Sequence, residues 1–305
     1  MRIFVPGSIG NVGPGFDVLG LAVEGLGDIV EVELTGGPAE VRAITGRDAE
    51  LVPLESDKNC AVVAAIALLE RRGIDRRPIV TIERGLPISG GLGASAAASV
   101  GGAVAAAAAA GVEATRVEIM QAALCGESLV AGRHLDNIAP SLFGGLTIAR
   151  SVDPPDVVEV PLGADWPLAL VTPPLRINTR DARRVLPESL PQADWVKQSA
   201  QTAALVAAFA SGSPELARRA LVDPYAEPRR SALIPGFDAA KKAALDQGAL
   251  GCSISGAGPT IFALCQDVAT ATKVAAAMAT AFDPTAVTHV GPIARQGARP
   301  VASSV

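Results

Sequence analysis

One glycine-rich stretch constrains the fold of this chain more than any other. It runs from Pro87 to Ala97, after a strand pattern at Ile79 to Glu83, and it opens a helix pattern from Ser95 to Ala110 that is almost wholly Ala, Gly and Val. Three glycines before a helix let backbone N–H groups converge on one point, where the helix N-terminus adds partial positive charge. The stretch therefore predicts a phosphate-binding loop.

The composition of the stretch excludes two common phosphate-binding loops. It contains no lysine or arginine, unlike the Walker loop, and its glycines do not have the spacing of the dinucleotide fingerprint. On its own, a glycine-rich turn that leads into a close-packed alanine helix explains the stretch equally well. The rest of the chain has to decide between the two interpretations.

Length, charge and cysteine usage limit the class of protein. A chain of 305 residues with 49% hydrophobic composition can form a large core and two domains. The net charge of −5, without a basic run, argues against nucleic acid, and no apolar run reaches membrane-spanning length. A strand pattern follows Met1 at once, so we expect no signal peptide. The four cysteines lack CxxC spacing, which predicts no zinc site and a reducing, cytoplasmic location.

Strand and helix patterns mix without strict βαβ order, which predicts α+β layers. The proline-rich segment from Asp153 to Asp156 is the best candidate boundary, so we expect one domain at 1–153 and another at 154–305. The tail at 296–305 is expected to fray.

Two further glycine motifs flank the phosphate loop in the sequence. Ser8 to Leu19 holds Asn11 and Asp17 among glycines and apolar residues, where a free carboxylate is costly unless it is paired. Turn chemistry explains the glycines of this motif but not its Asn and Asp. A third motif, Ile254 to Ala263, places a glycine loop between two strand patterns.

The three motifs in this order resemble those of the GHMP kinases (galacto-, homoserine, mevalonate and phosphomevalonate kinases). Within that superfamily the chain is most similar to the homoserine kinases, over nearly its whole length, with supporting stretches at 134–140, 178–183 and 226–230. The resemblance implies an N-terminal nucleotide-binding α/β domain and a ferredoxin-like α+β C-terminal domain. It also implies a left-handed βαβ unit, against the usual rule for such crossovers.

Two positions depart from the motifs of the family. Ala94 stands where the family usually has the first of two serines, and the stretch from Ser8 to Asn11 reads Ser-Ile-Gly-Asn in place of Thr-Ser-Ala-Asn. Ser95 keeps one hydroxyl for a magnesium ion or a phosphate oxygen, and backbone contacts survive both changes. Any effect should appear in nucleotide affinity and in the magnesium shell.

The resemblance implies ATP-dependent phosphorylation of the side-chain hydroxyl of L-homoserine, a step toward threonine. The implied nucleotide-binding residues are Asn59, Pro87, Ile88, Ser89, Gly90, Gly91, Leu92, Gly93, Ala94, Ser95 and Ala96. For Asn59, capping its own helix is nearly as good an interpretation. Ser95 and Glu127 match the ligands of Mg²⁺, although without the resemblance we would interpret Glu127 as an ordinary helix carboxylate.

The implied substrate site pairs each charge of homoserine with a partner of opposite charge. Asp17 takes the ammonium, with Asn11 beside it, and the guanidinium forks of Arg183 and Arg230 take the carboxylate. His134 assists the arginines. The alternatives are surface ion pairs for the arginines, which suit Arg180, Arg184 and Arg229 better, and a satisfied loop histidine for His134.

Asp136 and Asn137 match the position of the acceptor hydroxyl, and two interpretations compete. Asp136 is a general base, as a matching aspartate is in mevalonate kinase, or it orients the loop while Asn137 positions the hydroxyl and the γ-phosphate takes the proton. Homoserine kinases are generally taken to lack a dedicated base, so we favour the second.

Two other functions fit the same motifs less well. A sister kinase for mevalonate or shikimate is one, but mevalonate has no ammonium and leaves Asp17 unpaired. A non-catalytic sensor of the same fold is the other, and the presence of both Ser95 and Glu127 argues against it. The family also leads us to expect a homodimer.

Overall fold

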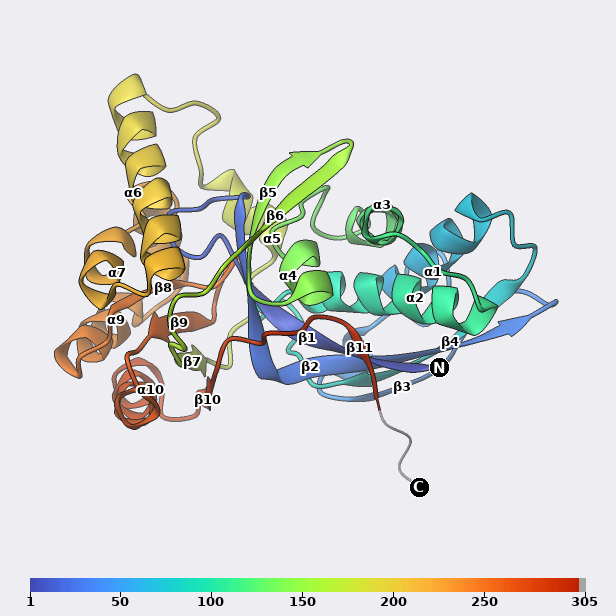
Figure 1. Ribbon diagram of the computed structural model, residues 1–305. Coiled ribbons are helices and arrows are strands. Elements are labelled where there is room, and N and C mark those ends of the chain that lie inside the picture. The colour runs from blue at the N-terminus through green and yellow to red at the C-terminus, as the bar shows by residue number, and fades with distance from the viewer. Residues whose placement is uncertain (302–305) are drawn as a thin grey trace.

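The computed structural model describes residues 1–301, which form two β-sheets in opposite halves of the molecule (Figure 1). The described part of the first sheet has seven strands: β1 (Arg2–Gly10), β2 (Leu19–Thr35), β3 (Glu40–Gly46), β4 (Arg77–Arg84), β5 (Leu146–Val152), β6 (Pro155–Val160) and β11 (Arg299–Pro300). The second has four, β7 (Leu168–Thr172), β8 (Gly251–Ile254), β9 (Ile261–Leu264) and β10 (Val287–Gly291), in the order β10-β7-β9-β8. Mixed helices and antiparallel strands confirm the predicted α+β class.

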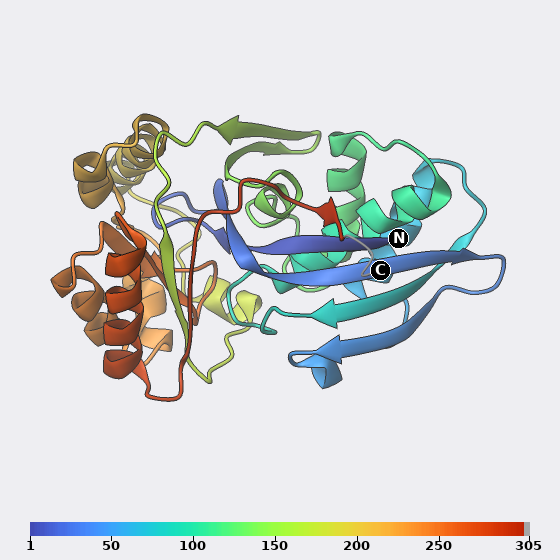
Figure 2. The ribbon, with the colours of Figure 1, turned by 60° about the horizontal axis from the view of Figure 1, so that its bottom comes forward.

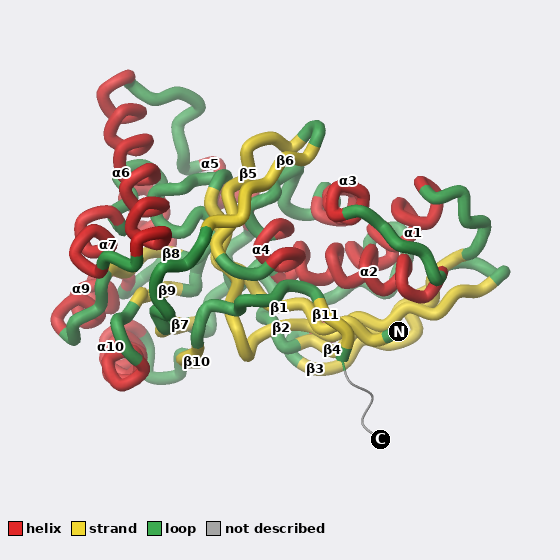
Figure 3. Tube along the Cα trace, in the orientation of Figure 1, coloured by secondary structure: helices red, strands yellow, loops and turns green. Residues whose placement is uncertain are grey.

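Helices cover one face of the first sheet (Figure 3). They are α1 (Cys60–Arg71), α2 (Ala94–Ala110), α3 (Arg116–Glu127) and the short α4 (Ile138–Phe143), with a 3₁₀ turn at Ala49–Leu51. A Cβ atom at Gly102 would lie 2.1 Å from the Ala61 carbonyl oxygen, and one at Gly101 would lie 2.5 Å from Val30 Cγ2. The alanine-rich helix is therefore close-packed on two sides, as the plain interpretation of its sequence predicted.

The second half of the molecule carries the remaining helices. They are α5 (Thr179–Arg184), α6 (Gln192–Ser211), α7 (Pro214–Ala220), α8 (Glu227–Arg230), α9 (Phe237–Asp246) and α10 (Val268–Phe282), with a 3₁₀ turn at Ser231–Leu233. Buried side chains of α9 and α10 form a core with strands of the second sheet. In the first sheet β3 and β4 run parallel and are joined through α1, while the left-handed sense of a βαβ unit stays a prediction.

The chain changes sheets later than its sequence suggested. β6 pairs with β5 as an antiparallel hairpin, with Val152 opposite Pro155, so the expected boundary at 153/154 falls inside a turn of the first sheet. The proline-rich segment was interpreted as a linker because the same residues favour tight turns and linkers. We propose instead a domain boundary after Val160.

The C-terminal segment returns to the first sheet, where it lies beside the N-terminus (Figure 2). Ile3 pairs with Pro300, so the expected fraying of 296–305 is wrong up to residue 301, and residues 302–305 lie outside the described part. A bridge between Val23 and Ile293 adds to this return. Within residues 1–301, no helix has both the length and the apolar character to cross a bilayer.

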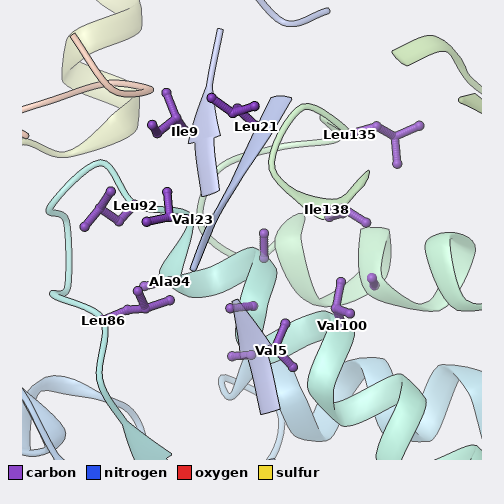
Figure 4. Close-up of a cluster of buried hydrophobic side chains, with 14 of the residues drawn as sticks. Val5, Ile9, Leu21, Val23, Leu86, Leu92, Ala94, Val100, Leu135 and Ile138 are labelled. Atoms are coloured by element: carbon purple, nitrogen blue, oxygen red, sulfur yellow. The ribbon is translucent and has the colours of Figure 1, made fainter. Parts of the chain in front are cut away.

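One core connects the sheet, the glycine-rich loop and the segment before α4 (Figure 4). Leu86 and Leu92 from the loop lie in the same cluster as Val5 of β1, and Leu135 and Ile138 enter it from the chain around α4. All five side chains are at most 2% exposed. Hydrophobic packing thus holds the predicted phosphate loop and the Asp136–Asn137 segment in fixed relation to one sheet.

Candidate functional site

The carbonyl groups of the loop between β4 and α2 point away from the loop, toward donors on other segments of the protein. Its four successive carbonyls at residues 89–92 accept hydrogen bonds from Ile177 N (3.2 Å), Thr260 N (3.2 Å), Ser255 Oγ (2.6 Å) and Ser8 N (3.1 Å), in that order. Within the described residues, the amides of residues 89–96 donate no hydrogen bond to protein. Free amides beside a helix N-terminus form an anion-binding site.

The glycines of this loop are required by close contacts with the other two motifs. Gly91 has φ 82°, and a Cβ atom there would lie 2.5 Å from the Ser255 carbonyl oxygen. Gly93 has φ 66°, and its Cβ atom would lie 2.1 Å from Ser8 Oγ. Left-handed backbone and the absence of a side chain let the three glycine motifs meet at one place.

A cavity of about 290 Å³ runs along the loop, and residues from both halves of the chain line it. It is lined by every predicted site residue except Leu92 and Ala96. These two side chains are buried in the core, at 2% and 0% exposure, so a nucleotide contact of either residue would come from its backbone amide and stays a prediction. Ala96 lies in the first turn of α2, which has one face on the cleft and one on the core, and Leu92 belongs to the loop just before this helix.

Glu127, at the end of α3, lies in the cleft with an unsatisfied carboxylate. Its side chain is buried, and Oε2 has no hydrogen-bond partner among residues 1–301. Burial raises the pKa of Glu127 to about 7, and the Asp136 carboxylate adds to the rise, while the Ser95 hydroxyl opposes it. An orphaned buried carboxylate beside a hydroxyl fits a site for a divalent cation. Among residues 1–301 no group of three His, Cys, Asp or Glu could hold a metal, so such an ion would keep phosphate or water ligands.

Asp136 and Asn137 meet the first glycine motif where α4 begins. Asn137 Oδ1 accepts a hydrogen bond from Ser8 Oγ (3.0 Å). A Cβ atom at Gly10 would lie 2.6 Å from Asp136 Oδ2 and from Asn137 Nδ2, so only glycine leaves room for this pair. Burial raises the pKa of Asp136 to about 7, with the Asp17 carboxylate adding to it. The pair therefore lies between the phosphate loop and the charged end of the cleft.

At the charged end, Asp17 and Arg183 form a bidentate ion pair. Arg183 Nη1 lies 3.0 Å from Asp17 Oδ2, and Nη2 lies 2.9 Å from Oδ1. His134 stands beside both, 3.7 Å from the carboxylate and 3.3 Å from the guanidinium, and burial lowers its pKa against the opposing effect of Asp17. Asn11 Oδ1 accepts the Asp17 amide (2.9 Å) and fixes the aspartate. The residues assigned to opposite charges of one ligand thus pair with each other.

Arg230 completes this end from the second domain. It is 3% exposed and donates to the Ala182 carbonyl through Nε (3.1 Å) and to the Gly256 carbonyl through Nη1 (2.9 Å). The Phe16 ring lies 5.2 Å from both the Arg183 and the Arg230 guanidinium carbons. Arg184, in contrast, is exposed and pairs with Asp181, as the surface interpretation predicted.

Two basic residues of the cleft carried no signal in the sequence. Arg84 and Lys58 line the cavity from outside the glycine-rich loop, whose own sequence contains no lysine or arginine. Each is a single charge without a motif around it. Asn59 caps α1, because its Oδ1 accepts from Ala61 N (3.1 Å) and Val62 N (3.3 Å). The capping alternative for Asn59 is therefore confirmed, and a nucleotide contact stays a prediction.

Family models match both halves of the chain: GHMP kinases N terminal domain over residues 59–145, and GHMP kinases C terminal over residues 185–284. A homoserine kinase of Chlorobium phaeobacteroides is 37% identical, over 98% of this chain and 98% of its own length. One from Thermococcus kodakarensis is 40% identical, covering 88% of this chain and 89% of the relative. The crystal structure of homoserine kinase from Cytophaga hutchinsonii superimposes with a TM-score of 0.92 at 37% identity, covering 99% of this chain and 97% of that one.

Proposed function

Because this chain belongs to the homoserine kinases of the GHMP kinase superfamily, we propose that it transfers the γ-phosphoryl group of ATP to the side-chain hydroxyl of L-homoserine. The observation that carries the choice of substrate is the Asp17–Arg183 pair with Arg230 beside it. One anion and two cations at one end of a cleft suit a ligand with an ammonium and a carboxylate on the same carbon. The product serves a pathway toward threonine.

The nucleotide end acts mainly through the backbone. Free amides of residues 89–96 and the N-terminus of α2 face the phosphates, which supports charge neutralisation without a lysine in the loop. Ser95 and Glu127 are the residues that would hold Mg²⁺. When bound, that ion neutralises charge on the transferred phosphoryl group.

The substrate end works by exchange of ion pairs. The substrate ammonium replaces Arg183 as the partner of Asp17, and the substrate carboxylate takes the released guanidinium together with Arg230. The Phe16 ring contacts both guanidinium groups, and His134 remains in reach of Arg183. The zwitterion adds one positive and one negative charge, so the net charge of this end stays the same, and the Arg230 guanidinium, which contacts only carbonyl groups without ligand, gains an anionic partner.

The acceptor hydroxyl lies beside Asn137, between the two ends. We assign Asn137 to positioning that hydroxyl and Asp136 to orienting the segment, with the γ-phosphate taking the proton. Ser8 Oγ donates a hydrogen bond to Asn137 Oδ1 and fixes the side-chain amide, which supports the positioning role of Asn137. The Asp136 pKa of about 7 also suits a base, and the kinetics of Asp136→Asn distinguish the two roles.

The function is tested by ADP release from Mg-ATP with homoserine, threonine, mevalonate and shikimate as acceptors. We expect turnover with homoserine alone, because mevalonate and shikimate offer no ammonium to Asp17. Turnover with mevalonate would assign the sister activity. Ligand binding without ADP release from any acceptor would make the protein a sensor.

Location and assembly are separate proposals. All four cysteines are free thiols, which supports a reducing, cytoplasmic environment. We propose a homodimer, as expected of the family, and light scattering of the purified protein tests it.

A further inference from the structure

Where β4 leaves the first sheet, the buried carboxylate of Asp28 accepts the backbone hydrogen bonds that a neighbouring strand would otherwise accept. The pairing of β2 with β4 reaches Ile29 and Glu83. The next amides, those of Gly85 and Leu86, donate to Asp28 Oδ1 at 2.9 and 3.0 Å. One side-chain oxygen thus satisfies two backbone donors at the point where the chain turns toward the phosphate loop.

The other half of this arrangement is Arg84. Its Nη2 lies 3.4 Å from Asp28 Oδ2 and donates to the Leu86 carbonyl at 3.2 Å, so the two side chains hold both polar groups of Leu86. The Arg84 side chain is 2% exposed and that of Asp28 is 0% exposed. A buried ion pair is a poor source of stability compared with apolar side chains of similar volume. Its location therefore points to a role in geometry.

Packing fixes the same two residues from the other side. A Cβ atom at Gly85 would lie 2.3 Å from the Gly27 carbonyl oxygen, and one at Gly7 would lie 2.7 Å from Leu86 Cδ2. Leu86 itself is buried in the core (Figure 4). Close packing therefore restrains the backbone at Gly85 and Leu86, just before the phosphate loop.

We propose that Asp28 and Arg84 are positioning residues that fix the start of the phosphate loop, so that the free amides of residues 89–96 converge on the nucleotide phosphates. They act through Gly85 and Leu86. The proposal rests on the proposed function only in taking the loop's ligand to be a nucleotide.

The test uses two double variants that share Arg84→Met and differ in the acceptor at position 28. Asp28→Asn with Arg84→Met keeps an oxygen for the two amides, whereas Asp28→Leu with Arg84→Met removes it. Neither leaves a buried charge unpaired, so both should fold. The control is Glu33→Leu with Arg42→Met, which removes an exposed ion pair between β2 and β3.

The readout is the Kd of Mg-ADP by calorimetry without homoserine, so it stays informative if the acceptor assignment is wrong. Loss of two hydrogen bonds should raise the Kd about tenfold for the Leu variant relative to the Asn variant. The control should match the wild type, and the KM for homoserine should change less than twofold in all variants. Equal Kd values for the folded Leu and Asn variants would overturn the proposal, as would a rise in the KM for homoserine alone.

Discussion

The two ends of the cleft are built from different atoms. At the nucleotide end, one continuous stretch presents backbone amides whose geometry depends on glycines having no side chain. At the substrate end, Asn11, Asp17 and His134 from the first domain meet Arg183 and Arg230 from the second. A backbone site tolerates changes of side-chain chemistry, such as Ala94, but not of volume. A side-chain site depends on charge balance and on how the domains are placed.

Glu127 lies where the two ends meet, and its loss should have the largest effect. Glu127→Gln should lower kcat by about 10³-fold, because several kcal/mol of charge stabilisation by a metal is lost. Steady-state kinetics across Mg²⁺ concentrations measures this. Glu118→Gln on the same helix is the matched control, since glutamine preserves the capping box with Thr115, and it should leave kcat unchanged.

Without ligand, the Glu127→Gln variant should be more stable than the wild type. The Glu127 pKa is raised from 4.5 to about 7, so the folded protein carries an unfavourable buried charge above pH 7. Removing that charge is worth about 1.4 kcal/mol for each unit of pKa shift. The gain should be full above pH 7 and vanish below pH 4.5, where both states are protonated. Thermal unfolding at pH 4, 6 and 8 tests the sign, and an equal Tm at pH 8 would contradict it.

Gly91→Ala tests the backbone end by volume alone. Its Cβ atom would meet the Ser255 and Gly258 carbonyl oxygens at 2.5 and 2.9 Å, so the loop must shift. We expect kcat/KM for ATP to fall about 10²-fold, the loss typical of one preorganised backbone donor. Gly111→Ala has the same left-handed strain at φ 67° with nothing within 4 Å, and it should retain activity. Equal losses in both variants would assign the effect to strain and not to the clash.

Arg183→Ala tests the side-chain end. It removes a charge-assisted hydrogen bond worth about 1.5–3 kcal/mol and leaves Asp17 without its partner. The KM for homoserine should rise roughly 10- to 100-fold, while the KM for ATP and kcat change little. Arg184→Ala, next in the sequence but exposed and paired with Asp181, is the control. A KM for homoserine that stays at the wild-type value would remove Arg183 from the carboxylate site.

The same contrast decides what the sequence could predict. That the glycine-rich loop precedes a helix and that Asn11 is held among glycines were predictable, because both belong to short local patterns with a direct physical reason, whereas phosphate binding stays a prediction. Arg84 and Asp28 were not predictable, because a single charge in a strand has the pattern of a solvated residue until the fold buries it. The pairing of Asp17 with Arg183 was also missed, since it depends on how two domains meet.

The prediction of the domain boundary was limited for a related reason. The predicted boundary separates β6 from β5, although the two strands pair in the first sheet, because a proline-rich turn and a linker share their composition. The pairing of β11 with β1 joins the two ends of the described chain, and no local pattern carries such a contact.

Asp136→Asn should have the smallest effect and gives the sharpest test of the contrast. If the γ-phosphate takes the proton, the introduced asparagine still orients the segment, and kcat should fall no more than about tenfold, below the 10²–10⁴ range of general-base catalysis. The pH profile of kcat near 7 should also persist, because the Asp136 pKa of about 7 does not control the chemical step. Asp181→Asn, on an exposed residue, is the control. Loss within the general-base range, with Mg-ADP and homoserine still bound, would make Asp136 the base, and side chains would then govern chemistry as well as recognition.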